Sequence, residues 1–390
     1  MPGLNYHIEN EVATIVLNNP PQNRIGDQMI DELEDAINAV GGSTTVLDPT
    51  RQCAAAEAFE RELRSRIVGQ DRAIHQLARM YQVHLSGLSA SDRPVANLLL
   101  LGPTGSGKTR LVEAAAEALF GDPRAMLKID CAEFQHSHEI AKLIGSPPGY
   151  LGHRETHPLL SQEAVNQFQT ETLKLSLVLF DEIEKANDAL WNLLLGILDK
   201  ATLTLGDNRR VDFSRAIIFM TSNLGAAEMS AILRPKLGFA AGPPDARQLE
   251  DKLAHAGTEA ARRRFTPEFL NRIDRVVTFH PLGAAEMQRI LDIELGLVQE
   301  RLACAVGPER MSLNVSRDAR EILLHEGTDQ RYGARHLKRV IERRLVQPLS
   351  NLIATSQVTA GDRVFIDGDA NGLVFSKEPV PAAGLAIAAA

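Results

Sequence analysis

Short apolar runs alternate with longer stretches of helical periodicity through the middle of the chain. Four of these runs are largely apolar and are followed by polar or glycine-rich segments: 97–101, 125–129, 175–180 and 216–221. Apolar character at nearly every position of so short a run is typical of parallel strands covered on both faces. The pattern therefore predicts an α/β domain in which a parallel sheet is flanked by helices.

The two ends of the chain differ from this pattern. The first forty residues predict a hairpin around Glu9–Glu11 and then an amphipathic helix that ends at Gly41–Gly42. After residue 281 the chain is mainly helical until a final strand pair at 363–366 and 372–375. The expected segments are a hairpin-helix docking element (1–41), a linker (42–56), a large α/β domain (57–280), a small helical domain with terminal strands (281–376) and an alanine-rich tail (377–390).

Composition narrows the class of protein. The 390 residues include 42 basic and 50 acidic side chains, a net charge of −8, and 44% are hydrophobic. This balance supports a folded core and disfavours a dedicated duplex-DNA binder, which needs a basic face. Cys53, Cys131 and Cys304 are widely spaced, so we expect no disulfide framework and a reducing, cytoplasmic location. No apolar run approaches the roughly 20 residues that span a bilayer, so no membrane partner is expected.

The sharpest chemical signal follows the first apolar run. It is a full match to the pattern GxxxxGK[ST], formed by Gly102, Pro103, Thr104, Gly105, Ser106, Gly107, Lys108 and Thr109. Glycines let backbone N–H groups wrap phosphates, and the helix that follows adds the positive end of its dipole. We expect Lys108 to reach the β- and γ-phosphates of a nucleotide and Thr109 to offer its hydroxyl to Mg²⁺.

A pair of carboxylates completes the predicted pocket. Asp181 and Glu182 directly follow the apolar run that ends at Phe180. We expect Asp181 to hold Mg²⁺ and Glu182 to polarise the attacking water, although a DE pair by itself is as often an ordinary helix cap. The second carboxylate favours hydrolysis of the nucleotide, and the lack of an NKxD motif favours ATP over GTP.

Seven motifs, in order along the chain, resemble the ATPase module of the Clp/heat-shock unfoldases in the AAA+ family. They are IVGQDRAI (67–74), GPTGSGKT (102–109), LIGSPPGYLG (143–152), LVLFDEIEKA (177–186), VDFSRAIIFMTSNLG (211–225), RFTPEFLNRIDRVVTFHPL (264–282) and YGARHLKRVIERRLVQPL (332–349). The likeness is greatest to the second ring of ClpB, ClpA and ClpC, in a short form with a single module. It implies the AAA+ P-loop fold, ATP hydrolysis in a homo-oligomeric ring, usually a hexamer, and threading of a client protein through a central pore.

The resemblance also implies roles that spacing alone does not give. Val68 and Gly69 match the segment that packs on adenine. Asn223 matches the sensor that orients the attacking water, although an isolated asparagine here would more simply be a turn residue. Arg335 matches a second sensor, which the small domain carries to the γ-phosphate.

One matched residue is expected to act on a neighbouring subunit. Arg272 matches the arginine finger, which reaches the ATP of the adjacent subunit and neutralises charge on the transferred phosphoryl group. The alternative for this residue is a surface ion pair with Asp274 or Glu268. If Arg272 is a finger, an isolated subunit should be a poor ATPase.

Three further segments are expected to contact other proteins. Tyr150 matches the aromatic residue of the loop that lines the pore and grips substrate, and Thr202–Arg210 corresponds to a second pore loop. Leu237–Gly238–Phe239 lies where related unfoldases dock on a ClpP-type peptidase, and the alternative is a loop that packs locally. Residues 4–40 resemble the opening hairpin and helix of the enoyl-CoA hydratase (crotonase) superfamily, without the length that its activity needs.

The favoured function is an ATP-dependent protein unfoldase or remodelling chaperone. Two alternatives from other classes remain at this point. One is an assembly factor dedicated to a single partner enzyme that binds residues 1–41. The other is a nucleic-acid-directed AAA+ motor, which the acidic charge balance disfavours.

Overall fold

The computed structural model describes residues 3–9, 12–18, 48, 51–146, 157–233, 246–306, 311–329, 333–359, 361–369 and 372–378. The chain divides into two compact units, Met1–Arg51 and Gln52–Ala390. In the first unit, β1 (Gly3–Glu9) and β2 (Val12–Asn18) form an antiparallel pair, which confirms the predicted hairpin. The helix predicted before Gly41–Gly42 and tail residues 379–390 lie outside the described residues.

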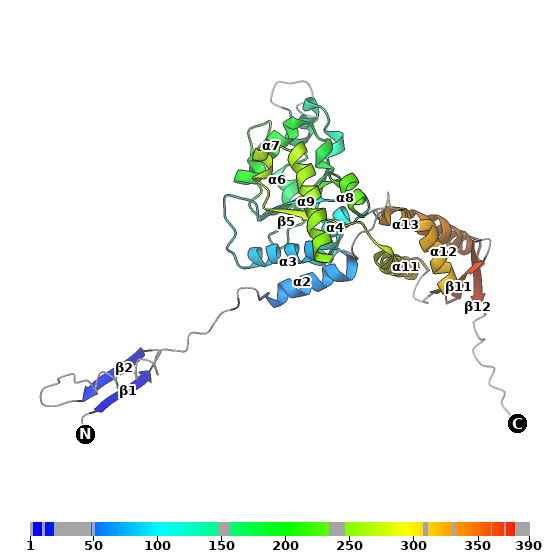
Figure 1. The fold of residues 1–390 in the computed structure, drawn as a ribbon, viewed down its shortest axis with the longest axis horizontal. Helices are drawn as coiled ribbons and strands as arrows, with labels where there is room; N and C mark the ends of the chain where they lie inside the picture. Colours follow the sequence, from blue (N-terminus) through cyan, green and yellow to red (C-terminus); the bar gives the residue numbers. More distant parts are fainter. Residues whose placement is uncertain are drawn as a thin grey trace, which may run out of the picture. The chain divides into compact units, whose positions relative to one another are not determined.

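A five-stranded parallel sheet is the centre of the second unit (Figure 1). Its strand order is β4–β5–β8–β3–β9. The strands are β3 (Ala96–Leu101), β4 (Leu127–Asp130), β5 (Ser176–Asp181), β8 (Ala216–Ser222) and β9 (Arg275–Thr278). The first four confirm the predicted strands. The hydrophobic pattern did not predict β9, because only the second half of this short edge strand is buried and its first residue is an exposed arginine.

Helices cover both faces of the sheet, which explains why its strands lack a polar face. On β3, Leu98 and Leu100 pack in one cluster with the first three helices, while Leu99 and Leu101 pack in another with the later ones. These helices are α2 (Ala54–Arg66), α3 (Asp71–Leu85) and α4 (Lys108–Phe120) on the first side, and α7 (Asp188–Lys200) and the end of α9 (Ala246–Arg264) on the second. Because α2 begins at Ala54, residues 54–56 are helical and the predicted linker was too long.

Shorter elements join the strands and helices of this large domain. They are η1 (Cys131–Glu133), η2 (Ser137–Ile140), α5 (Ala141–Ile144), α6 (Gln162–Asn166), η3 (Ile183–Lys185), β6 (Thr202–Thr204), β7 (Arg210–Asp212), α8 (Ala226–Leu233) and α10 (Pro267–Leu270). Strands β6 and β7 form a hairpin in the segment matched to the second pore loop.

The C-terminal part of the second unit has its own hydrophobic core. It contains α11 (Ala284–Val306), β10 (Ser312–Val315), α12 (Arg317–Gly327), α13 (Ala334–Ile341), the π-helical turn η4 (Glu342–Val346), α14 (Gln347–Ala354), β11 (Arg363–Asp369) and β12 (Gly372–Glu378). The predicted strand pair is confirmed as β11–β12, and β10 adds a third, parallel strand. None of the helices in the described residues has the length and apolarity needed to span a bilayer.

Candidate nucleotide-binding site

A cavity of about 290 Å³ lies where the carboxyl ends of the central strands meet the small domain. It brings together segments that are far apart in the sequence. The lining residues are Arg66, Ile67, Val68, 104–110, Glu113, Lys128, Asp181, Glu182, Thr221, Asn223, Leu282, Ile290, Ile293, Glu294, Ala334, Arg335 and Lys338. Ligands of open α/β sheets bind at this edge of the sheet, beyond the carboxyl ends of the strands.

Lys108 is buried at the centre of the phosphate loop. Its Nζ donates hydrogen bonds to the carbonyl oxygens of Gly102 and Pro103, at 2.7 and 2.9 Å, and to Asn223 Oδ1 at 2.9 Å. Burial lowers the pKa of Lys108 to about 8, although the negative charge of Glu184 acts in the opposite direction. The ammonium is thus held among oxygen acceptors that phosphate oxygens could replace, at the start of α4.

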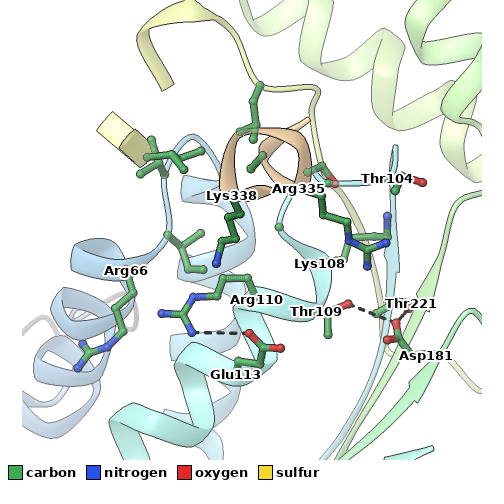
Figure 2. Close-up of a pocket in the computed structure, with 18 of the residues that line it drawn as sticks. Arg66, Thr104, Lys108, Thr109, Arg110, Glu113, Asp181, Thr221, Arg335 and Lys338 are labelled. Carbon is green, nitrogen blue, oxygen red and sulfur yellow. Dashed lines mark hydrogen bonds and ion pairs between the residues drawn. The ribbon is translucent and has the colours of Figure 1, made fainter. Parts of the chain in front are cut away.

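Asp181 lies at the end of β5, next to the phosphate loop. Its Oδ1 accepts hydrogen bonds from the hydroxyls of Thr109, at 3.3 Å, and of Thr221 (Figure 2). Its Oδ2 pairs with Lys128 Nζ at 3.1 Å. Burial alone would raise the pKa of Asp181, but the bonds from Thr221 and Lys128 outweigh it and hold the pKa below its usual value. The carboxylate is therefore ionised beside a hydroxyl, a set of hard oxygen ligands that suits Mg²⁺.

Glu182 follows in a strained backbone conformation. Its φ is 57°, which is uncommon for a residue other than glycine and costs roughly 1–2 kcal/mol. Its N–H donates to Thr221 Oγ1 at 3.0 Å, and its carboxylate pairs with Lys185. Strain of this kind is found at functional sites, where the surrounding structure fixes it. The turn places Glu182 on the cavity wall.

Asn223 lies at the end of β8, between the phosphate loop and the strand that carries Asp181. Its side-chain oxygen accepts from Lys108 and lies 3.4 Å from Thr104 Oγ1. Its backbone N–H donates to Glu184 Oε1 at 3.0 Å. The residue predicted as a sensor is therefore held by both its backbone and its side chain, in contact with the residue predicted to bind phosphate.

The small domain closes one side of the cavity through direct backbone contact. The N–H of Ala334 donates to the carbonyl of Gly105 at 3.2 Å. Gly333 has a φ of +52°, and a Cβ added there would lie 2.8 Å from the oxygen of Gly105. Only glycine permits this approach. Arg335 follows, and Figure 2 shows its side chain beside Lys108.

Part of the cavity lining is apolar. Ile67 and Val68 face the cavity from the segment after α2, and Ile290 and Ile293 face it from α11. Such a lining suits a planar base, in keeping with the prediction for Val68. Gly69 is not among the described lining residues, and a Cβ added there would meet the Glu286 side chain at 2.8 Å.

Sequence reasoning missed Gln70, a buried residue that joins three segments. Its Nε2 donates to the carbonyls of Ser106, at 3.2 Å, and His280, at 3.0 Å, and its Oε1 accepts from the N–H of His280 at 3.2 Å. Gln70 thereby fixes the phosphate loop against the last residue of the large domain, directly before the small domain begins. The sequence signal was its place in the motif IVGQDRAI (67–74), which gives no hint of its partners.

Arg272 is placed outside the cavity, at the opposite end of the sheet. Its carbonyl accepts from Asn97 Nδ2 at 3.0 Å, near the start of β3, whereas the phosphate loop begins where β3 ends. Its Nη1 pairs with Asp199 at 3.0 Å. The alternative predicted an ion pair of Arg272 with Asp274 or Glu268, but the partner in the structure is Asp199. Asp274 is instead bonded to the N–H of Asn97 and to Arg93.

Two predicted contact sites lie outside the described residues. These are Tyr150, within residues 147–156, and Leu237–Gly238–Phe239, within residues 234–245. The base of the Tyr150 loop is described: the N–H of Gly206, in the β6–β7 turn, donates to the carbonyl of Ile144 at 2.8 Å. The base of the first segment matched to a pore loop is thus joined to the turn of the second.

Comparison with known proteins identifies the family. Residues 93–276 match the family described as AAA domain (Cdc48 subfamily), and residues 282–366 match the C-terminal, D2-small domain of ClpB. The chain belongs to the Clp branch of the AAA+ family. The expected family and fold class are confirmed.

Individual relatives agree with this assignment. The chain is 38% identical over 320 residues to the chaperone protein ClpB of Bdellovibrio bacteriovorus and 40% identical over 318 residues to that of Leptolyngbya boryana. Each alignment covers 81% of this chain and 34% of the relative, so the chain spans about a third of their length. A closed state of Hsp104, reconstructed by cryo-EM with ATPγS and FITC-casein, matches with a TM-score of 0.69 and 29% identity, over 90% of this chain and 56% of that one.

Proposed function

We propose that this chain hydrolyses ATP in a homo-oligomeric ring, a hexamer, and threads client polypeptide through a central pore to unfold or remodel it. The similar proteins support the class of activity, since they are named ClpB chaperones and Hsp104 was imaged with casein. The observation that carries the proposal is the distance between the nucleotide cavity and Arg272.

Arg272 cannot serve the cavity of its own chain. Its backbone is bonded to the second residue of β3, and the phosphate loop follows the last one. The five strand residues 97–101 separate the backbone of Arg272 from the start of the phosphate loop, which corresponds to about 15–20 Å. An arginine finger at this place can complete only the site of a neighbouring copy, so full activity requires a ring.

Within one site, each residue is assigned a role from its position in the cavity. Lys108 and Arg335 would neutralise charge on the β- and γ-phosphates, while Ile67 and Val68 hold the base. Thr109 and Asp181 would hold Mg²⁺, which supplies positive charge beside the leaving phosphate. Glu182 would accept the proton of the attacking water, and Asn223 would orient that water.

Other parts of the proposal rest on the family resemblance. We assign the large ATPase domain to 54–280 and the small domain to 281–378, and we place the protein in the cytoplasm. Tyr150 would grip substrate in the pore. A ClpP-type peptidase would dock at 237–239.

The test compares ATP hydrolysis and oligomer size for wild type, Glu182→Gln and Arg272→Ala, with and without an unfolded protein. Glu182→Gln should bind ATP and assemble but turn over at least about 100-fold more slowly, because the amide cannot accept the proton. Arg272→Ala should bind ATP and hydrolyse it about 1,000-fold more slowly at any concentration. Normal turnover by Arg272→Ala, or a wild type that is monomeric and fully active, would contradict the proposal.

The same assay tests the nucleic-acid alternative. Stimulation of ATP hydrolysis by DNA and not by unfolded protein would favour a nucleic-acid motor.

The separate N-terminal unit supports a second candidate, an assembly factor dedicated to one partner enzyme. Residues 1–51 form a compact unit apart from the ATPase. The test is deletion of residues 1–41. If the truncated protein unfolds general substrates normally but loses a single partner, this candidate gains; if general unfolding is lost, it is contradicted.

A further inference from the structure

Glu184 occupies a place that the proposed mechanism does not use. It lies in η3, two residues after Glu182, and its Oε1 accepts the backbone N–H of Asn223 at 3.0 Å. Its other oxygen, Oε2, is buried and has no hydrogen-bond partner among the described residues. A buried carboxylate oxygen without a hydrogen-bond partner destabilises the folded state, which raises the question of what the position of Glu184 contributes.

The backbone of Glu184 makes a second connection, to the end of α9. Its carbonyl accepts a hydrogen bond from Arg264 Nη2 at 3.1 Å. The Arg264 guanidinium lies 4.3 Å from the centre of the Trp191 ring, and Trp191 Nε1 donates to the carbonyl of Ile183 at 3.0 Å. Arg264 and Trp191 together therefore clamp two successive carbonyls of the loop that carries Glu182 and Glu184.

The same clamp leads directly to the finger segment. Phe265 and Phe269 pack on Trp191, with ring centres 5.2 and 6.4 Å away. The N–H of Arg272 donates to the carbonyl of Phe269 at 3.1 Å. A continuous series of contacts thus runs from Asn223, at the nucleotide cavity, to Arg272, at the far end of the sheet.

We propose that Glu184 is a positioning residue that fixes Asn223 through its carboxylate and the finger segment, residues 264–272, through its carbonyl. Movement of Asn223 at one nucleotide site is then transmitted to the finger offered to the next site. The proposal rests on the proposed function for Arg272. It distinguishes Glu184 from a catalytic base, because its Oε1 accepts from the backbone N–H of Asn223, its Oε2 is buried, and the residue is not among the described residues that line the cavity.

Two substitutions of Glu184 test the carboxylate. The amide oxygen of Glu184→Gln can still accept from the Asn223 N–H, so kcat should stay within about threefold of wild type, whereas Glu184→Ala should lower kcat by about tenfold or more. The KM for ATP should change little in both. An equal decrease of kcat in the two variants would indicate that Glu184 is a catalytic base. A normal kcat in Glu184→Ala would refute the proposal.

Hydrogen exchange tests the coupling without requiring hydrolysis. In the nucleotide-free full chain, Glu184→Ala should speed exchange at the Asn223 amide and within 264–272, while Glu184→Gln should leave both protected. Arg264→Ala should speed exchange in the same segment. Arg263→Ala is the matched control, because this exposed residue pairs with Glu228 instead, and should change nothing. Unchanged exchange in Glu184→Ala would overturn the proposal, whereas an inactive wild type would overturn only the proposed function.

Discussion

At the scale of single residues, the site is organised around buried charges that a nucleotide would complete. Lys108 is 7% exposed, and its positive charge has only neutral oxygens as hydrogen-bond partners in the described structure. Asp181 is ionised because hydroxyls and Lys128 favour its charged form. The two groups thus hold opposite charges at the two places where phosphate and Mg²⁺ are proposed to bind.

The pKa of Lys108 gives nucleotide binding a pH dependence. Because its pKa is about 8 in the nucleotide-free protein, the side chain loses its proton as the pH rises through 8. Phosphate favours the protonated form, so ATP affinity should be constant below pH 7 and fall above pH 8, by up to about tenfold per pH unit. Binding at pH 8.5 should also take up a proton. Titration calorimetry in two buffers of different ionisation enthalpy measures this uptake.

Lys108→Met is the control for this prediction. It removes the titrating group while keeping a long side chain, so its weaker affinity should not vary with pH between 7 and 9. If the variant retains the wild-type pH dependence, another group is responsible and the assignment to Lys108 is wrong.

At the scale of elements, close backbone approaches decide how the two domains enclose the cavity. The start of α13 rests on the phosphate loop, through the N–H of Ala334 and the bare Cα of Gly333. Gln70 holds the other side of the loop to His280. The affinity for a nucleotide that contacts both domains should therefore depend on this backbone contact between them.

Gly333→Ala should weaken nucleotide binding by about 5- to 30-fold, equivalent to roughly 1–2 kcal/mol. The added Cβ would collide with the oxygen of Gly105, and the positive φ disfavours alanine. Fluorescent ADP titration measures the loss. Gly296→Ala in α11 is the matched control, because its Cβ would meet nothing within 4 Å and alanine favours a helix, so binding should be normal. Equal affinities in the two variants would show that this contact does not matter for binding.

At the scale of the whole molecule, Arg272 is separated from the cavity of its own chain, so under the proposed function each active site would combine residues of two copies. The Asn97 side chain reinforces this separation by donating to the carbonyls of both Leu198 and Arg272. The finger is therefore anchored to the end of α7 and the start of β3. If Arg272 acts as proposed, a subunit that lacks its own finger would still receive the finger of a neighbour.

Mixing two inactive variants should restore activity. In a ring of equal parts Glu182→Gln and Arg272→Ala, about a quarter of the sites should combine an intact Glu182 with a neighbour's intact Arg272. ATP hydrolysis should rise to a comparable fraction of wild type, and steady-state assays after subunit exchange measure it. If exchange is verified by size and labelling and no activity returns, the finger does not act between subunits.

The sequence predicted much of the fold and of the candidate site. Four of the five central strands, the phosphate loop and the carboxylates at the end of β5 were recognisable because each is a local pattern. Gln70 and Glu184 were overlooked because their importance depends on partners elsewhere in the chain. The same is true of Asp199, the partner of Arg272.

By itself, the sequence determined the α/β class of the large domain and the chemistry of the phosphate loop, because hydrophobic periodicity and glycine-rich turns act over a few residues. Only the tertiary structure decided which segments enclose the cavity and that Arg272 faces away from it. These relations depend on packing between residues up to 210 positions apart, such as Gln70 and His280, and distant packing leaves no mark in a local pattern.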